Sequence, residues 1–92
     1  MFRVLVESGV LERINALPKN EADNLKRRLK ALESDPFPDG RDKKEIKGSR
    51  RTAYRLRADN YRFFYVIEKE NRIAKITEFM TAEQAHKKYG RL

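Results

Sequence analysis

Three arginines stand close together in the second half of the chain, on either side of a short turn-forming sequence. Arg55 and Arg57 alternate with apolar residues in Tyr54-Arg55-Leu56-Arg57, which is the period-two pattern of a half-buried strand. Ala58-Asp59-Asn60 then supplies two residues that tolerate a positive φ, so the chain can reverse tightly before Arg62. Two strands joined in this way would gather three guanidinium groups, which are planar, permanently charged and matched to phosphate oxygens.

The strand expected after this turn, Tyr61 to Ile67, is an almost unbroken run of aromatic and β-branched residues. That composition is typical of a strand covered on both faces, near the centre of a sheet. The aromatic side chains of the hairpin could be platforms on which bases stack, but their alternation within strands favours the core for most of them: Tyr54, Tyr61, Phe63, Phe64 and Tyr65. Tyr89 is the exception, because it lies on a short tail among basic residues.

Charge indicates the kind of partner. The chain has 92 residues, with 22 Lys and Arg against 14 Asp and Glu, a net charge of +8 and a pI near 10. Residues 41–57 hold eight of the basic residues and only two acidic ones. So concentrated a basic segment suggests a polyanion such as nucleic acid, although a solvated basic surface explains the composition equally well. The RNA-binding candidates besides the three arginines are Lys43, Lys44, Arg50, Arg51, His86, Lys87 and Arg91.

Proton transfer needs a different side chain, because arginine is a poor base at neutral pH. A lysine whose pKa is lowered by positive neighbours could serve, and the candidates are Lys47 and Lys88. His86, the only histidine, is another. For His86 and Lys47 the alternative is a solvent-facing residue without a catalytic role. For Arg62 the alternative is a purely structural ion pair, with Glu68 or Glu78 as its partner.

Composition also excludes several classes of protein. The chain has no cysteine, so neither a disulfide framework nor a thiolate metal site is available, and we expect no metal and no cofactor. No apolar run approaches the roughly 20 residues of a transmembrane helix. The first seven residues lack the apolar region and cleavage site of a signal peptide. We therefore expect a soluble cytoplasmic protein without a membrane partner, folded as one domain over residues 1–92.

The first half of the chain predicts a strand and two helices. A short apolar strand is expected at residues 2–6, followed by a helix that Ser8 caps and that runs to about Leu17. Asn20 is the expected cap of a second helix, whose apolar residues keep helical spacing: Ala22, Leu25, Leu29 and Leu32. The loop at residues 34–40 holds two prolines and a glycine, and its Phe37 is expected to pack back onto the core.

The second half predicts strands and a final short helix. A charged edge strand is expected at residues 43–47, then the hairpin strands at 54–57 and 61–67, and another strand at 72–79. Thr81 and Gln84 fit a capping box that starts a helix through Tyr89, with Gly90 as its C-cap. The expected fold is α+β: an N-terminal strand, an antiparallel helix hairpin packed on a twisted, mainly antiparallel four-stranded sheet, and a short C-terminal helix.

Several short motifs occur in a fixed order along the chain: Leu17-Pro18-Lys19, Lys47-Gly48-Ser49, Tyr54-Arg55-Leu56-Arg57 and Asn60-Tyr61-Arg62-Phe63-Phe64-Tyr65-Val66-Ile67. In this order, the chain resembles the RelE/ParE toxin superfamily, small basic α+β proteins from bacterial and archaeal toxin–antitoxin pairs. That family's form of the last motif is Gly or Asp, then Tyr-Arg, two apolar residues, Tyr and an apolar residue. The resemblance runs from about residue 2 to residue 80.

The RelE branch of this resemblance implies a ribonuclease that cuts messenger RNA in the ribosomal A site by attack of the 2′-hydroxyl. It implies that Arg62 contacts the scissile phosphate, that Arg55 and Arg57 add positive charge and proton transfer, and that Tyr89 can stack on a base. The family's second important arginine follows the last strand, where this chain reads Phe79-Met80-Thr81-Ala82 instead. The next basic residues are those of His86-Lys87-Lys88, so the tail either supplies the missing charge or activity is altered.

The resemblance also implies partners and leaves two other functions open. A RelE-like toxin is expected to act on the ribosome and messenger RNA and to be neutralised by a RelB-like antitoxin, in a complex that could be a heterotetramer. The missing late arginine slightly favours a ParE-like inhibitor of DNA gyrase, whereas the clustered arginines favour RNA. The third alternative is a catalytically inactive basic protein of the same fold that only binds RNA or its antitoxin.

Overall fold

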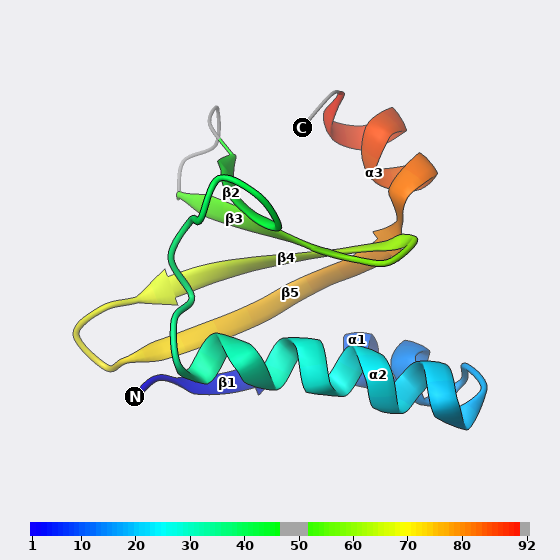
Figure 1. Ribbon diagram of the computed structural model, residues 1–92, viewed down its shortest axis with the longest axis horizontal. Helices are drawn as coiled ribbons and strands as arrows, with labels where there is room; N and C mark the ends of the chain where they lie inside the picture. Colours follow the sequence, from blue (N-terminus) through cyan, green and yellow to red (C-terminus); the bar gives the residue numbers. More distant parts are fainter. Residues whose placement is uncertain (47–51, 91–92) are drawn as a thin grey trace.

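The computed structural model describes residues 1–46 and 52–90 and shows an α+β fold built on a twisted five-stranded sheet (Figure 1). The strands lie in the order β1-β5-β4-β3-β2. Their bounds are Arg3–Val6 (β1), Lys43–Ile46 (β2), Ala53–Ala58 (β3), Tyr61–Glu68 (β4) and Ile73–Thr81 (β5). The helices are Ser8–Asn15 (α1), Lys19–Lys30 (α2) and Ala82–Tyr89 (α3), with a single 3₁₀ turn at Ala31–Glu33.

The expected fold class is confirmed, with one more strand in the sheet than the four anticipated. β1 joins the sheet as an edge strand, because it pairs in parallel with β5, whereas every other neighbouring pair is antiparallel. The apolar run Tyr61–Glu68 is the central strand, as its composition predicted. β2 is the opposite edge strand and ends at Ile46; Lys47, expected to be its last residue, lies outside the described residues.

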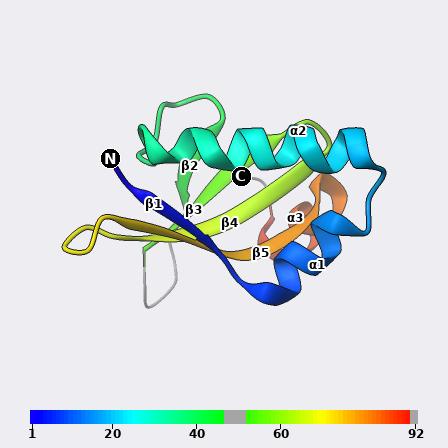
Figure 2. The same cartoon turned by 90° about the horizontal axis from the view of Figure 1, so that it is seen from below.

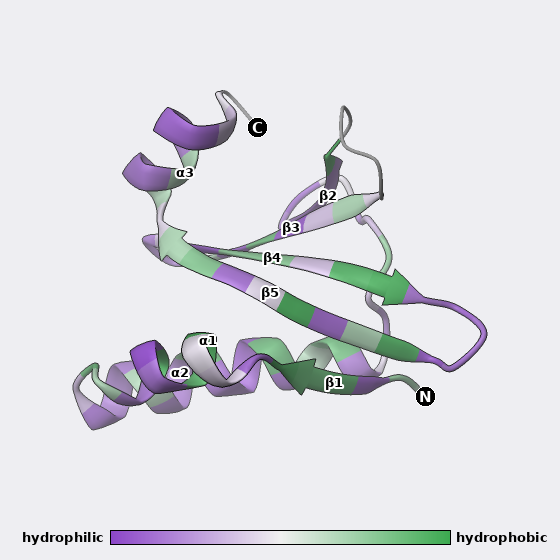
Figure 3. Cartoon of the chain, turned by 180° about the vertical axis from the view of Figure 1, so that it is seen from behind, coloured by the Kyte–Doolittle hydropathy of each residue, from purple (hydrophilic) through white to green (hydrophobic). Residues whose placement is uncertain are grey.

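The two faces of the sheet are covered differently. Helices α1 and α2 pack across one face, and α3 lies over one end of the other face (Figures 1 and 2). The main core lies under α1 and α2. It contains the expected apolar residues of α2 and of the 3₁₀ turn after it, together with inward-facing residues of the three central strands: Ala22, Leu25, Leu29, Leu32, Leu56, Phe63, Tyr65 and Ile76. Figure 3 shows that α3 is mostly hydrophilic while β1 and β4 carry hydrophobic stretches. None of the helices among the described residues is long and apolar enough to cross a membrane.

The N-caps of both N-terminal helices lie earlier in the chain than expected, by one residue in α1 and by two in α2. Glu7 occupies the N-cap of α1 without a capping side-chain bond, so Ser8 is the first helical residue rather than the cap. Pro18 occupies the N-cap of α2, because its ring holds φ at −52° and it has no N–H to satisfy. Asn20 therefore lies inside the first turn, where its side chain accepts a hydrogen bond from the Glu21 amide at 3.0 Å. Helix α1 also ends at Asn15, short of Leu17.

The loop after the helices is anchored by its proline rather than by Phe37. Pro36 is buried, and its carbonyl accepts a 2.7 Å hydrogen bond from the hydroxyl of Tyr65 in the central strand. Phe37 is only partly buried and packs edge-on against Phe2, with ring centroids 5.6 Å apart. Burial, with the negative charge of Asp39 nearby, raises the pKa of Tyr65 above its usual range, so this hydroxyl stays a donor at neutral pH.

A β-bulge in β5 sets which residues of that strand face α3. Phe64 pairs with Glu78 but its neighbour Tyr65 pairs with Ile76, so Thr77 is an extra residue in β5. The Thr77 hydroxyl donates to the Phe64 carbonyl at 3.3 Å. Because a bulge shifts the alternation of side chains by one residue, Glu78 lies on the α3 face instead of pointing into the main core.

The main core predicts that substitutions of Leu25 and Leu11, one in each N-terminal helix, differ in their effect on stability. Leu25 is 1% exposed and Leu11 is 40% exposed. We expect Leu25→Ala to lower the free energy of unfolding by about 2–5 kcal/mol, since it leaves a cavity in the core. Leu11→Ala is the matched control and should cost less than about 1 kcal/mol. Urea unfolding followed by circular dichroism measures both, and equal losses would contradict the assigned core.

Candidate active site

A pocket of about 220 Å³ lies between the β3–β4 hairpin and α3, on the sheet face away from α1 and α2. We call it the arginine pocket, because Arg55, Arg57 and Arg62 form its wall on the sheet side. The wall on the helix side comes from α3 and its C-cap: Ala82, Ala85, His86 and Gly90. The structure thus brings together the three arginines of the hairpin and the single histidine of the chain.

Strand register explains why the three arginines share one face. Arg57 and Arg62 are directly opposite each other across the hairpin, and Arg55 is two residues from Arg57 along β3. Alternate residues of β3, Tyr54 and Leu56, point the other way and are buried in the main core. The turn that makes this pairing possible has Asp59 at φ 54°, a conformation that aspartate tolerates better than most residues.

Arg55 is the most deeply placed of the three. Its residue is 5% exposed, one terminal nitrogen donates to the Arg41 carbonyl at 3.4 Å, and its Nε is buried without a hydrogen-bond partner. Burial lowers the pKa of Arg55, and the positive charge of Arg57 lowers it further. A buried donor without an acceptor costs free energy that an anion in the pocket would recover.

Arg62 and Arg57 differ in what holds them. Arg62 donates to the carbonyls of Asp59 at 3.1 Å and Tyr61 at 2.8 Å, and none of the salt bridges among the described residues involves it. The alternative of a purely structural ion pair between Arg62 and Glu78 is therefore wrong, because Glu78 pairs with Lys88 instead. Burial lowers the pKa of Arg62, with further contributions from the charges of Arg55 and Arg57. Arg57 is half exposed and pairs with Asp42 at 3.3 Å.

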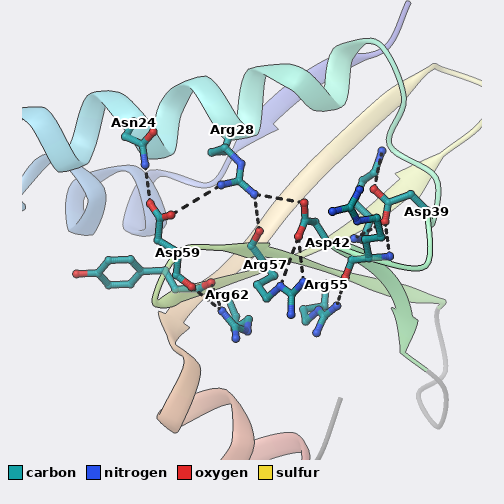
Figure 4. A network of polar contacts seen from close by, with 11 residues as sticks. Asn24, Arg28, Asp39, Asp42, Arg55, Arg57, Asp59 and Arg62 are labelled. Atoms are coloured by element: carbon teal, nitrogen blue, oxygen red, sulfur yellow. Dashed lines mark hydrogen bonds and ion pairs between the residues drawn. The ribbon is translucent and has the colours of Figure 1, made fainter.

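A polar network behind the arginine pocket fastens the hairpin to α2 (Figure 4). Arg28 of α2 donates to the Arg57 carbonyl at 2.8 Å and pairs with Asp42 at 3.7 Å and Asp59 at 4.0 Å. Asn24 donates to Asp59 at 2.6 Å. These contacts hold the turn and the backbone of Arg57, and no carboxylate of residues 1–46 or 52–90 pairs with the guanidinium groups of Arg55 and Arg62. Sequence analysis did not identify Arg28 or Asp42, because their partners are far away in the chain.

Helix α3 forms as its capping box predicted. The Thr81 hydroxyl accepts from the Gln84 amide at 3.1 Å, the Gln84 side chain accepts from the Thr81 amide at 2.9 Å, and Gly90 follows at φ 77°. Ala82, Ala85 and His86 lie three and four residues apart, so they share one side of the helix. That spacing could have pointed to Ala82 and Ala85 as pocket residues from the sequence.

Lys88 and Tyr89 do not enter the arginine pocket. Lys88 donates to Glu78 at 2.5 Å, the Tyr89 hydroxyl also donates to Glu78, and the Tyr89 ring packs against Phe64 with centroids 4.7 Å apart. The expectation of a lowered pKa at Lys88 is wrong, because its hydrogen bond to Glu78 and the charge of that carboxylate raise the pKa. Tyr89 likewise contacts the sheet and does not lie on a free tail where it could stack on a base.

The remaining candidates are spread over the surface or lie outside the described residues. Lys43 donates to the Asp35 carbonyl at 2.6 Å, and Lys87 pairs with Glu83 at 3.5 Å along α3. Lys44 is exposed on β2, opposite Arg55 in the strand register. Lys47, Arg50, Arg51 and Arg91 fall outside the ranges that the structure describes. Within those ranges, no group of three or more His, Asp or Glu side chains is arranged to hold a metal ion.

Comparison of sequences does not place the chain, because no protein-family model and no curated protein matches it. Comparison with solved structures does show which fold the chain has. The archaeal RelE in the RelE–RelB complex of Pyrococcus horikoshii OT3 aligns with a TM-score of 0.74 at 24% identity, over 87% of this chain and 93% of that chain. The toxin–antitoxin complex RelBE2 of Mycobacterium tuberculosis gives 0.74 at 17% identity, over 87% and 96%.

The isolated RelE toxin of E. coli aligns with a TM-score of 0.70 at 18% identity, over 96% of this chain and 98% of that chain. These three similarities span nearly the whole of each protein and come from archaeal and bacterial toxins alike. The chain therefore has the fold of the RelE toxins.

Proposed function

We propose that this protein is the toxin of a toxin–antitoxin pair and an endoribonuclease that cuts messenger RNA in the ribosomal A site. The observation that carries the proposal is the arginine pocket, in which three arginines and the only histidine surround a space of about 220 Å³. The unpaired and buried Nε of Arg55 points to an anionic occupant. The RelE fold supplies the context, since the solved relatives are toxins or toxin–antitoxin complexes.

The chemistry follows from the side chains at the pocket. The 2′-hydroxyl of a ribose loses its proton and attacks the adjacent phosphorus, the bond from phosphorus to the 5′-oxygen breaks, and that oxygen takes up a proton. The products end in a 2′,3′-cyclic phosphate and a 5′-hydroxyl. Negative charge grows on the phosphate oxygens during attack, and in this proposal the guanidinium groups of Arg62 and Arg55, which line the pocket, stabilise it.

His86 is the best-placed group for proton transfer. Among the described residues that line the pocket, it is the one besides the arginines with an ionisable side chain, and histidine in general exchanges protons near neutral pH. Lys88 is a weaker candidate, since its ion pair with Glu78 keeps it protonated. This chain lacks the late arginine of the family. In this assignment the turn of α3 that carries His86 takes over the role of that arginine. Met80 and Thr81, at that place, pack under α3 and cap it.

The proposed partners are the ribosome with its messenger RNA and a RelB-like antitoxin. Two of the structural relatives are RelE–RelB or RelBE2 complexes, which supports an antitoxin for this chain as well. A reading frame next to its gene should encode a small acidic protein, because opposite charge favours association with a chain of net charge +8. Since the late arginine is replaced, inhibition of DNA gyrase is the second candidate, and a supercoiling assay with purified gyrase separates the two.

Arg62→Ala should lower the rate of messenger RNA cleavage by about 10²- to 10³-fold, because it removes a charged donor at the growing phosphate charge. The measurement is primer extension on a translated transcript after induction. Arg27→Ala is the control, since it removes the same charge from an exposed site on α2 outside the pocket. Intact transcripts alongside growth arrest by the wild type would rule out cleavage as the function.

His86→Gln should lower the cleavage rate by about 10²- to 10⁴-fold with little change in RNA affinity, because it removes proton transfer but none of the arginines. Single-turnover cleavage on programmed ribosomes gives the rate, and a binding titration gives the affinity. Lys87→Gln, the adjacent and exposed residue of α3, is the matched control. A His86→Gln protein that cleaves at the wild-type rate would remove His86 from the mechanism.

A further inference from the structure

Helix α3 is docked on the sheet separately from the other helices. Its buried contacts form a small second core of Phe64, Met80 and Ala85, to which Tyr89 adds a partly buried ring. None of these residues belongs to the main core under α1 and α2. A helix of eight residues is marginal without tertiary contacts, so what fastens its two ends decides whether it stays in place.

The two ends of α3 are fastened in different ways. The first turn is held by the capping box and by a 2.9 Å hydrogen bond from the Ala82 amide to the Asn60 carbonyl of the hairpin turn. The last turn is held by the Glu78 carboxylate, to which Lys88 and Tyr89 both donate, and by the packing of the Tyr89 ring on Phe64. The other ion pair of this helix, between Lys87 and Glu83 at 3.5 Å, lies within the helix and does not reach the sheet.

Glu78 reaches α3 because of the β-bulge at Thr77. Its side chain is 30% exposed, so water competes only partly for the carboxylate. Burial by itself would raise the pKa of Glu78, but the hydrogen bonds from Lys88 and Tyr89 outweigh burial and lower it. The pKa of Lys88 is raised by the same contact, so both groups carry full charge at neutral pH.

The last turn that Glu78 holds also completes the arginine pocket. His86 lies in this turn, and its carbonyl accepts a 2.8 Å hydrogen bond from the amide of Gly90, the other pocket residue at this end. The arginines, in contrast, are carried by two strands of the sheet and are braced by α2. Release of the last turn would thus move His86 and leave the arginines where they are.

We propose that Glu78 is a positioning residue of the arginine pocket: by binding Lys88 and Tyr89 it keeps the last turn of α3 docked and His86 facing the three arginines. Its effect on cleavage rests on the proposed function, whereas its effect on α3 does not. Loss of Glu78 should therefore impair the step that needs His86 and spare the binding of phosphate by the arginines.

Amide hydrogen exchange, measured by NMR, tests the docking. Glu78→Gln and Lys88→Gln should each speed exchange at residues 87–90 by roughly threefold or more, because each removes a charge-assisted hydrogen bond. The charge swap Glu78→Lys with Lys88→Glu should restore protection in part, because it remakes the ion pair but leaves no acceptor for the Tyr89 hydroxyl. A purely steric role for Glu78 would predict no rescue. Glu83→Gln is the control, since it breaks the ion pair that stays within α3. Wild-type exchange in both single variants would overturn the proposal.

Titration with inorganic phosphate tests the positioning of His86. Because the chain has one histidine, its ring protons give a single assignable set of NMR signals. In the wild type, phosphate should shift both these ring signals and the backbone amides of Arg57 and Arg62. In Lys88→Gln the amide shifts should remain and the His86 shift should fall by half or more. An undiminished His86 shift in that variant would show that the ion pair does not position the histidine.

The two experiments separate this proposal from the ribonuclease proposal. If phosphate shifts neither His86 nor the arginines in the wild type, the phosphate pocket fails, and the exchange experiment still decides whether Glu78 holds α3. On programmed ribosomes, Lys88→Gln should lower the single-turnover rate of cleavage while RNA affinity stays near that of the wild type. Unchanged cleavage by a variant with an opened helix would overturn the positioning role.

Discussion

The pairing of β3 with β4 across a two-residue turn is the constraint on which the site depends. It sets Arg57 opposite Arg62 and places Arg55 on the same face, while the residues between them fill the main core. A register slip of one residue in either strand would turn the arginines toward α2 and the aromatic residues toward water. The same apolar contacts that stabilise the sheet therefore fix where its positive charges emerge.

Three guanidinium groups so close together repel one another, and the three differ in the partners that offset this repulsion. Arg57 has Asp42, whereas Arg62 is held by backbone carbonyls and Arg55 by a single carbonyl, with one donor left unpaired. The mutual repulsion and the burial both lower the pKa of Arg55 and Arg62. An anion in the pocket would relieve these costs together, which is the physical basis of the proposed phosphate site.

Much of the fold was predictable from the sequence, because it depends on local patterns. The apolar run of β4, the alternation in β3, the turn at Asp59 and the capping box of α3 all act within a few residues of the chain. The N-caps of α1 and α2 were predicted wrongly; at α2, Pro18 competes with Asn20 for the start of the helix and the sequence does not say which prevails. The bulge at Thr77 was also missed, although it decides which way Glu78 points.

The site was predictable only where its residues are close in sequence. The arginines of one hairpin could be grouped without coordinates, but Arg28, Asp42 and Glu78 act through partners that only the tertiary structure brings near. Lys88 shows the consequence: it was expected to have a lowered pKa among positive neighbours, and the carboxylate it meets reverses the direction.

The central claim is that the three arginines form one binding site for a phosphate group. The most direct measurement follows the Nε–H signals of the arginine side chains by ¹⁵N NMR during titration with inorganic phosphate. The account predicts a saturable shift of the Arg55 Nε–H, since this donor is buried and unpaired and belongs to a side chain that lines the pocket. Shifts confined to the exposed arginines of α2, with Arg55 unchanged up to saturation, would contradict it.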